Sequence, residues 1–487
     1  MEIPFHYLNL TELAERICSG SLRPSILVEE IFSRIEELDN RLKAFQSLTR
    51  KRALNEAEKA EKEIESGRYR GPLHGIPYAA KDLFDVEEMP TKAGCRLLAD
   101  NRANKDSAAV SRLSEAGMVL AGKTHTVQFA FSGVGINHDL GTPHNPWKEN
   151  AYVPGGSSSG SAVAVASGQV PMALGTDTGG SVRIPAALCG IVGLKTTVGR
   201  ISRAGVYPLS WTLDSVGVLT RSVEDAALVF QALQGPDPDD EATLKVSSAD
   251  VLRELKDGVA GLRLIFPETI FFDEVDPEVE KAVRASAQVF QSLGAKIESM
   301  KVPEVSEAHG TKKRALMIAA EACVVNEKFL RDHYRELDPV VAERMKAGQA
   351  LSAPEYLSLL RRWQELQRSC QKTLTDVDAL LVPTTMIPAR PVAEVDSSLE
   401  TYFWHNGRYL RNTSLGNILN WCAVSVPCGF TREGLPIGLM IYAKPFQEDV
   451  ALRVAYAYEQ ATDWHNRHPD LSWIKQTAKS SAPGGTK

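Results

Sequence analysis

Serine hydroxyls, glycine backbone and one lysine are the groups whose types and spacing could do chemistry in this sequence. The segment from 152 to 195 is rich in Gly and Ser, and it contains "PGGSSSGS" and, further on, "TDTGGS". The second motif places Ser181 after Thr178, Gly179 and Gly180, whose backbone N–H groups could turn together toward an anion. Small side chains let a substrate carbonyl approach such donors, which can then stabilise an oxyanion. Ser181 is therefore the candidate nucleophile.

A serine nucleophile needs a base, and none of the ten His residues lies in a comparable setting. Lys81 stands out instead, because it follows the apolar run in "LHGIPYAAKDLFDV". A lysine buried there loses the solvation of its charge, so its pKa falls toward the value that a general base needs at neutral pH. Lys81 is the candidate base.

Other interpretations of the Gly- and Ser-rich segment are less well supported. A loop of this kind before a helix can bind phosphate, but no Lys follows at the P-loop spacing, which disfavours a nucleotide site. A flexible linker would not run directly into "SAVAVASG", whose small side chains suit tight packing of a helix on a sheet. His465 and His468 in "HNRH" indicate a polar helix end rather than a metal site.

Composition narrows the class of protein. The chain has 487 residues, 43% of them hydrophobic, with 55 Lys and Arg scattered among 61 Asp and Glu for a net charge of -6. This pattern favours neither nucleic acid nor an anionic membrane as a partner. The first residues lack the pattern of a signal peptide, no stretch is apolar enough for a membrane span, and the seven Cys form no C-x-x-C pair. We therefore expect a cytoplasmic protein with reduced thiols.

Periodicity predicts the elements that must position these groups. Residues 22–66 have the apolar spacing of helices, and Gly67 ends the second of them. Short β-branched segments from about 71 to 220 indicate an α/β core. Further on, "GLRLIF", "DPEVEKAVRASAQVFQSLG" and "AKIESMKV" predict a strand–helix–strand unit. Residues 305–377 are mostly helical, "DALLVP" is a strand, "AVSVPCG" and "LPIGLMIYA" are two strands joined by a turn, and "EDVALRVAYAYEQAT" is a closing helix.

These elements predict one large α/β/α sandwich, with a mixed β-sheet covered by helices. We divide the chain into an N-terminal helical layer over 1–70, a catalytic domain over 71–475 and a disordered tail over 476–487. No internal repeat suggests a solenoid.

Four long segments together resemble the amidase signature family, in order and at similar spacing, across nearly the whole chain. They are "GIPYAAKDLFDV", "GKTHTVQFAFSGVGINHDLGTPHNPW", "PGGSSSGSAVAVASGQVPMALGTDTGGSVRIPAALCGIVGLK" and "GLPIGLMIYAKPFQEDVALRVAYAYEQATDW". Agreement of several long motifs is a highly specific signal, and it implies the amidase signature fold.

The resemblance implies a catalytic triad of Ser181, Ser157 and Lys81, with a cis peptide bond between Gly156 and Ser157. In such a triad, neutral Lys81 takes a proton from Ser157, which takes one from Ser181 as its oxygen attacks the acyl carbon. The expected scheme is an acyl-enzyme that forms without metal or organic cofactor.

Further site residues follow from the same resemblance. Ser158 is expected to hydrogen-bond the triad, and Asp177 and Arg183 to hold the loop together through charged hydrogen bonds. The oxyanion is assigned to the backbone N–H groups of Thr178, Gly179, Gly180 and Ser181. The expected substrate pocket has walls from residues 310–420 and includes Phe129, Phe131, Ile184 and Trp211, although core packing of both Phe residues is an equally open alternative.

Members of the family differ in substrate. This sequence departs from two of them in ways that narrow the range of expected substrates. Ile184 stands where the glutaminase-type subunit of glutamyl-tRNA amidotransferase generally has Gln, which disfavours glutamine-dependent transamidation. No apolar N-terminal segment is available to dock on a membrane as in the fatty acid amide hydrolase. We expect a stand-alone amidohydrolase that acts on a small-molecule amide, carbamate or ester, and the resemblance suggests a homodimer.

Three alternatives stay open. The chain could be an aryl acylamidase or a carbamoyl-type hydrolase such as a urethanase, acting on biuret, allophanate or urethanes. It could be a transamidase-like catalytic chain, such as the glutaminase-type subunit of glutamyl-tRNA amidotransferase, that needs a partner chain. It could also be a non-catalytic scaffold, against which the intact triad argues.

Overall fold

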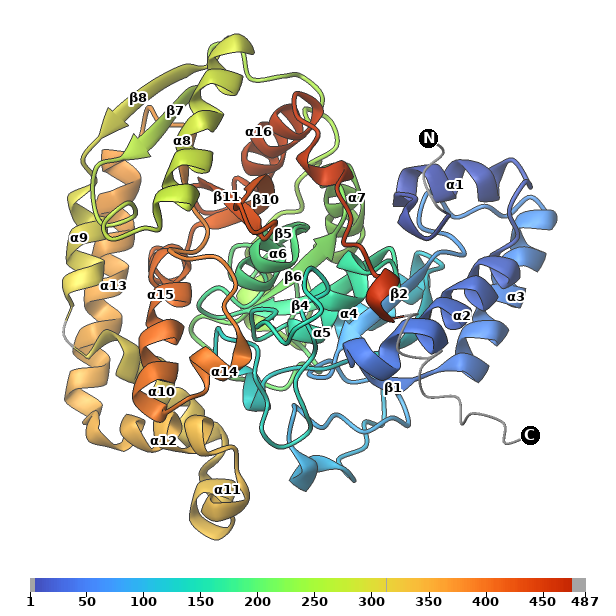
Figure 1. Cartoon of the computed structure of the whole chain (residues 1–487), viewed down its shortest axis with the longest axis horizontal. Helices are drawn as coiled ribbons and strands as arrows, with labels where there is room; N and C mark the ends of the chain where they lie inside the picture. The colour runs from blue at the N-terminus through green and yellow to red at the C-terminus, as the bar shows by residue number, and fades with distance from the viewer. Residues whose placement is uncertain (1–4, 312, 475–487) are drawn as a thin grey trace, which may run out of the picture.

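Eleven strands form one mixed sheet through the middle of the molecule (Figure 1). The computed structural model describes residues 5–311 and 313–474 of the chain. Along the sheet the strand order is β1-β3-β2-β4-β6-β5-β10-β11-β9-β7-β8. The strands are β1 (Phe45–Leu48), β2 (Pro77–Lys81), β3 (Val119–Thr124), β4 (Met172–Asp177), β5 (Val192–Lys195), β6 (Ser215–Thr220), β7 (Arg263–Pro267), β8 (Lys296–Met300), β9 (Ala379–Pro383), β10 (Cys422–Phe430) and β11 (Pro436–Ala443).

Parallel pairing of β2 with β4 is the feature of the sheet that positions the site. Strand β2 lies between β3 and β4 and is parallel to both, with Ala79 opposite Ala173 and Ala80 opposite Leu174. On its other side β4 pairs antiparallel with β6. Because parallel strands end at the same edge of a sheet, the residues that follow β2 and β4 emerge side by side.

Helices cover both faces of the sheet. Every residue of β2, β3, β4, β6 and β11 is buried, as expected for strands covered on both sides. The predicted α/β/α sandwich is thereby confirmed. The helices are α1 (Leu10–Cys18), α2 (Pro24–Leu42), α3 (Arg50–Glu65), α4 (Ala108–Glu115), α5 (Ser159–Ala166), α6 (Arg183–Cys189), α7 (Val223–Leu233), α8 (Pro277–Ser292), α9 (Pro303–Gly310), α10 (Arg314–Val325), α11 (Glu327–Asp332), α12 (Pro339–Ala347), α13 (Ala353–Thr373), α14 (Val392–Val395), α15 (Leu399–Ile418) and α16 (Glu448–Gln460).

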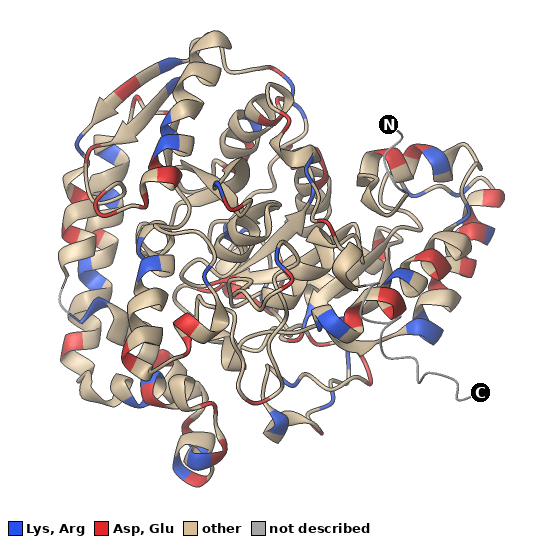
Figure 2. Ribbon diagram, viewed as in Figure 1, with Lys and Arg blue, Asp and Glu red and all other residues tan. Residues whose placement is uncertain are grey.

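Two groups of helices lie at opposite sides of the sheet. The N-terminal helices α1 to α3 lie at one side, and α9, α10, α12, α13 and α15 lie at the other (Figure 1). Blue and red residues are interspersed along these outer helices, whereas the central strands are mostly tan (Figure 2). Within residues 5–311 and 313–474, no helix has both the length and the apolar composition needed to cross a bilayer.

Most predicted elements are confirmed, and one prediction is wrong. The strand–helix–strand unit is β7–α8–β8 with parallel strands, and the predicted pair of C-terminal strands is the antiparallel pair β10–β11. The helical stretch predicted over 22–66 is interrupted, because Lys43 adopts a left-handed conformation that ends α2 and the next residues form β1 against β3. The predicted tail over 476–487 lies outside the described residues, and the division at residue 70 stays a prediction.

Close contact between α15 and β11 yields a stability prediction. A Cβ on Gly416 would lie 2.1 Å from a ring atom of Tyr442. Gly416→Ala should therefore lower the free energy of unfolding by about 1–3 kcal/mol through overpacking. Gly407 on the same helix has no neighbour within 4 Å of an added Cβ, so Gly407→Ala should raise it by about 0.5–1 kcal/mol. Urea unfolding of both variants checks this, and equal midpoints would contradict the packing argument.

Candidate active site

The candidate base and both candidate hydroxyls come together at one edge of the sheet. Lys81 is the last residue of β2, and the neighbouring β4 leads directly into the loop that carries Ser181. Ser157 lies just before α5 and is joined to Gly156 by a cis peptide bond. Lys81 Nζ donates hydrogen bonds to Ser157 Oγ at 2.7 Å and to Thr176 Oγ1 at 2.8 Å. The lysine therefore contacts hydroxyls rather than carboxylates.

The environment of Lys81 favours its neutral form. The side chain has no exposed surface, and burial lowers its pKa to about 7. The charges of Asp214 and Asp177 act in the opposite direction without reversing the shift. Among the ion pairs of the described residues, none includes Lys81. An amine with this pKa is neutral in about half of the molecules at neutral pH and can accept a proton.

Ser181 lies where its hydroxyl can meet a bound molecule. It is 4% exposed and lines a cavity of about 280 Å³. Its backbone oxygen accepts a hydrogen bond from Ser158 N at 3.1 Å, which holds it beside the segment that contains Ser157. Within the part of the chain that the structure describes, Ser181 Oγ makes no hydrogen bond. The hydroxyl is thus available to a molecule in the cavity.

The loop after β4 presents three of the four predicted N–H donors. In the described chain, no hydrogen bond is made by the N–H groups of Thr178, Gly179 or Ser181. The fourth prediction is wrong, because Gly180 N donates to Asp177 Oδ1 at 2.9 Å and is not available to a substrate. Gly180 has a φ of +137°, in the region that favours glycine. This conformation directs the N–H group of Gly180 toward the carboxylate of Asp177.

Asp177 and Arg183 hold this loop through a buried, bidentate ion pair. Arg183 Nε donates to Asp177 Oδ2 at 3.0 Å, and Nη2 donates to Oδ1 at 2.9 Å. Asp177 also accepts hydrogen bonds from Val182 N at 3.2 Å and Asn417 Nδ2 at 2.9 Å. Burial raises the pKa of Asp177, but the charge and hydrogen bonds of Arg183 outweigh it and hold the pKa well below its usual range. The positions of both residues agree with the supporting role expected of them.

Asp214 fixes the loop from the other side and was not predicted. Thr178 Oγ1 donates to Asp214 Oδ1 at 2.5 Å, and the N–H groups of Leu209 and Ser210 donate to Oδ2, both at 2.9 Å. Burial raises the pKa of Asp214. The residue directly precedes β6, and the pairing of β6 with β4 brings it to the loop. That pairing is a tertiary fact with no local signal in the sequence.

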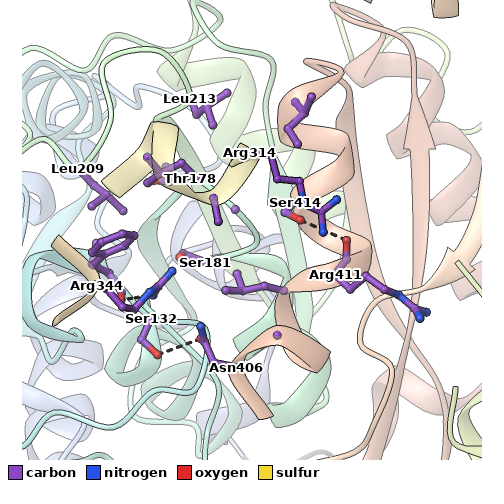
Figure 3. A pocket seen from close by; sticks show the side chains of 18 of the residues that line it. Ser132, Thr178, Ser181, Leu209, Leu213, Arg314, Arg344, Asn406, Arg411 and Ser414 are labelled. Atoms are coloured by element: carbon purple, nitrogen blue, oxygen red, sulfur yellow. Dashed lines mark hydrogen bonds between the residues drawn. The ribbon is translucent and has the colours of Figure 1, made fainter. Parts of the chain in front are cut away.

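The cavity beside Ser181 has apolar walls interrupted by three arginines (Figure 3). Its lining comes from residues 130–132, from the loop after β4, from the loop before β6 and from helices α10, α12, α13 and α15. The residues are Ala130, Phe131, Ser132, Thr178, Gly179, Ser181, Leu209, Leu213, Arg314, Ala315, Ile318, Arg344, Trp363, Phe403, Asn406, Gly407, Leu410, Arg411, Ser414 and Ile418.

Of the four side chains predicted to line the pocket, only Phe131 does so. Phe129 is fully buried, with its ring 5.8 Å from the ring of Tyr207, so the alternative of core packing holds for it. Ile184 is also fully buried in the main hydrophobic core. Trp211 is 47% exposed and lines a separate hollow. Side-chain direction in a turn or at a helix start depends on tertiary packing, which motif position does not reveal.

The polar lining of the pocket is what sequence reasoning missed. Residues within 310–420 do line the cavity beside Ser181, since α10, α12, α13 and α15 all contribute. Arg314, Arg344 and Arg411 were not singled out, because each is one arginine among many on a charged helix. Within the described chain, no group of three or more His, Cys, Asp or Glu is arranged to hold a metal ion.

The chain is similar in sequence to proteins of a known family. A family model described as Amidase matches residues 26–452. A similar protein is 2-amino-5-chloromuconic acid deaminase of Comamonas testosteroni, 36% identical over 458 residues, which cover 93% of this chain and 96% of that protein. The A subunit of glutamyl-tRNA(Gln) amidotransferase from Chloroflexus aurantiacus is 35% identical over 488 residues, covering 96% of this chain and 99% of that protein.

Solved structures agree with this comparison. The native peptide amidase from Stenotrophomonas maltophilia superposes with a TM-score of 0.82 at 30% identity, covering 94% of this chain and 98% of that structure. Both the sequence and the fold are therefore similar over almost the entire chain.

The ion pair in the loop leads to a prediction about stability. Asp177→Asn would leave the Arg183 guanidinium buried without a counter-charge, so the free energy of unfolding should fall by about 3–5 kcal/mol. Urea unfolding at neutral pH measures the difference. The control is Asp239→Asn, which removes an exposed ion pair with Lys105 and should leave the midpoint unchanged. An Asp177→Asn midpoint equal to that of the wild type would refute the structural role of the pair.

Proposed function

Because the chain belongs to the amidase family of carbon–nitrogen hydrolases, we propose that it cleaves a small-molecule amide through an acyl-enzyme on Ser181. The observation that carries the proposal is the contact between Lys81 and Ser157. A buried lysine with a pKa of about 7 lies 2.7 Å from a hydroxyl and forms no ion pair with any carboxylate of the described residues. A structural lysine would gain stability from an acidic partner, whereas a base has to remain deprotonated.

The proposed reaction moves one proton along the chain of hydroxyls. Neutral Lys81 accepts the proton of Ser157, Ser157 accepts that of Ser181, and Ser181 Oγ forms a bond to the acyl carbon. The N–H groups of Thr178, Gly179 and Ser181 stabilise the resulting oxyanion.

Collapse of the oxyanion breaks the carbon–nitrogen bond, and the proton returns through Ser157 to the leaving nitrogen. Water then gives its proton to the same relay and releases the acid, which regenerates the serine. No step requires a group outside this chain other than substrate and water.

A second candidate function is that of a transamidase component, which the similarity to the A subunit of glutamyl-tRNA(Gln) amidotransferase favours. The cavity argues against glutamine as the substrate. Among its described lining residues there is no Asp or Glu to pair with the ammonium group of a free amino acid. The stand-alone hydrolase is therefore the better proposal.

We also propose that the protein works in a reducing compartment, because all seven Cys are free.

A substrate panel tests the nucleophile. Wild type and Ser181→Ala are incubated with a primary aryl amide, an anilide, an aryl carbamate, glutamine and biuret, and the released ammonia or amine is measured. The alanine variant should lose more than about a thousandfold in kcat, because no other group can form the acyl-enzyme. Ser159→Ala, which removes a neighbouring buried hydroxyl outside the relay, should remain active. Wild-type turnover by a folded Ser181→Ala variant would sink the proposal.

The pH profile tests the base. Since Lys81 must be neutral to accept a proton and its pKa is about 7, kcat/KM should rise with pH and level off above about 7. Below that value the rate should fall about tenfold for each pH unit. Lys81→Met keeps an apolar side chain of similar length and should abolish the reaction across the whole range. A flat profile from mildly acid to alkaline pH, with chemistry limiting, would be incompatible with this role.

A further inference from the structure

The charged residues that line the cavity all carry the same sign. Arg314, Arg344 and Arg411 contribute to its walls, and its described lining includes no acidic side chain. Elsewhere in the molecule some half-buried arginines pair with carboxylates, as Arg52 does with Asp106, whereas Arg112 donates to backbone oxygens. An excess of positive charge in a concave, largely apolar site concentrates anions there. The cavity is therefore arranged to receive a negatively charged group.

Arg344 lies at the Phe131 side of the cavity. Its guanidinium carbon is 3.9 Å from the centre of the Phe131 ring, and Nη1 donates to the backbone oxygen of the same residue. No described carboxylate lies within ion-pair distance of Arg344. Burial lowers its pKa to about 10, so the charge is retained at neutral pH but is poorly compensated. A guanidinium has five donors, and within the described residues Arg344 uses only one of them.

Arg314 projects from a different wall, formed by the first turn of α10. Nη1 donates to the backbone oxygen of Ala308 at 3.3 Å, and no described carboxylate is within ion-pair distance. The positive end of the helix dipole at this position disfavours a cation unless an anion joins it. Arg411 lies near Arg314, but its guanidinium donates to the backbone oxygens of Asp273 and Phe271 and points away from the cavity (Figure 3). Arg314 and Arg344 are therefore the lining arginines whose guanidinium N–H groups are mostly not hydrogen-bonded within the described chain.

The rest of the lining is largely apolar. It includes Leu209, Leu213, Ile318, Trp363 and Leu410. A substrate that fits must place its amide carbon at Ser181, run a short apolar chain along the walls and end in an anion that a guanidinium can bind.

We propose that the acyl part of the substrate carries a carboxylate that Arg344 and Arg314 bind, so that the substrate is the half-amide of a dicarboxylic acid. This inference rests on the proposed function. The carboxylate accepts from the planar guanidinium donors, the hydrocarbon chain packs on the leucines and Trp363, and the amide lies at Ser181. Both arginines are specificity-determining residues and take no part in the proton relay.

Matched substrates provide the first test. Succinamate, glutaramate and adipamate are each compared with the isostere in which an isopropyl group replaces the carboxylate. At low ionic strength the best half-amide should have a kcat/KM at least about tenfold above that of its isostere, and added salt should narrow the gap. Equal kcat/KM values for every pair would overturn the proposal.

Arginine variants provide the second test. Arg344→Gln and Arg314→Gln should each lower kcat/KM for the preferred half-amide by about 10- to 100-fold, mainly through KM, and change that of the isostere by less than about threefold. Arg344→Lys should restore part of the loss. The control Arg361→Gln changes an exposed arginine on α13 and should affect neither substrate. Equal losses on both substrates would show a merely structural role and overturn the assignment.

Binding separates this inference from the proposed function. Calorimetric titration of Ser181→Ala with the matching dicarboxylate should show binding that Arg344→Gln weakens about 10- to 100-fold. If the folded enzyme hydrolyses no amide at all, the proposed function fails, and this titration still decides the anion site. If neutral amides are hydrolysed in a Ser181-dependent manner but half-amides and dicarboxylates are not bound, only the present inference fails.

Discussion

A lysine amine buried against two hydroxyls, with no carboxylate of the described chain within ion-pair distance, is the arrangement on which the rest of this site depends. Water or an acidic neighbour would restore the charge of Lys81, so the surrounding elements have to exclude both. The parallel pairing of β2 with β4 and the fully buried α5 enclose the amine on the sheet. The carboxylates whose charges act on Lys81, Asp177 and Asp214, are held by other donors and do not form ion pairs with it. Neutrality at this position is thus a property of the packing.

A second buried cation, Arg183, lies close to the same loop, and its charge is compensated where that of Lys81 is not. Arg183 is as deeply buried as Lys81, yet Asp177, Asn417 and Tyr442 satisfy its guanidinium with short hydrogen bonds. The charge of Arg183 is fully compensated, so this residue stabilises the loop. Lys81 contacts hydroxyls only, so it can exchange a proton. Since Asp177 lies at the end of β4, it keeps the loop and the nucleophile in position relative to the amine.

Local chemistry could be predicted from the sequence, and distant packing could not. Lys81, Ser157 and Ser181 belong to long motifs, so motif reasoning proposed them together. Lys81 ends β2, and Ser181 follows the neighbouring strand β4. The pocket is built from helices that lie far apart in sequence. Its lining depends on which face each helix turns toward Ser181, and Phe129 and Trp211 show how a residue close to a motif can still point elsewhere. The prediction that the N–H group of Gly180 faces the substrate was wrong for a similar reason, because this group donates to the side chain of Asp177.

One face of helix α15 serves both the loop and the cavity, and this constrains how the enzyme can diverge. Thr413 and Asn417, one turn apart, hold the loop of Gly179 and Asp177, while Asn406, Leu410 and Ser414 line the cavity on successive turns. A rotation of the helix that adapted the pocket to a new molecule would also pull on the loop. New specificities are therefore expected to arise by exchanging side chains on one face of a fixed helix. Substrate range in this scaffold should be easy to alter by substitution and hard to alter by movement of the backbone.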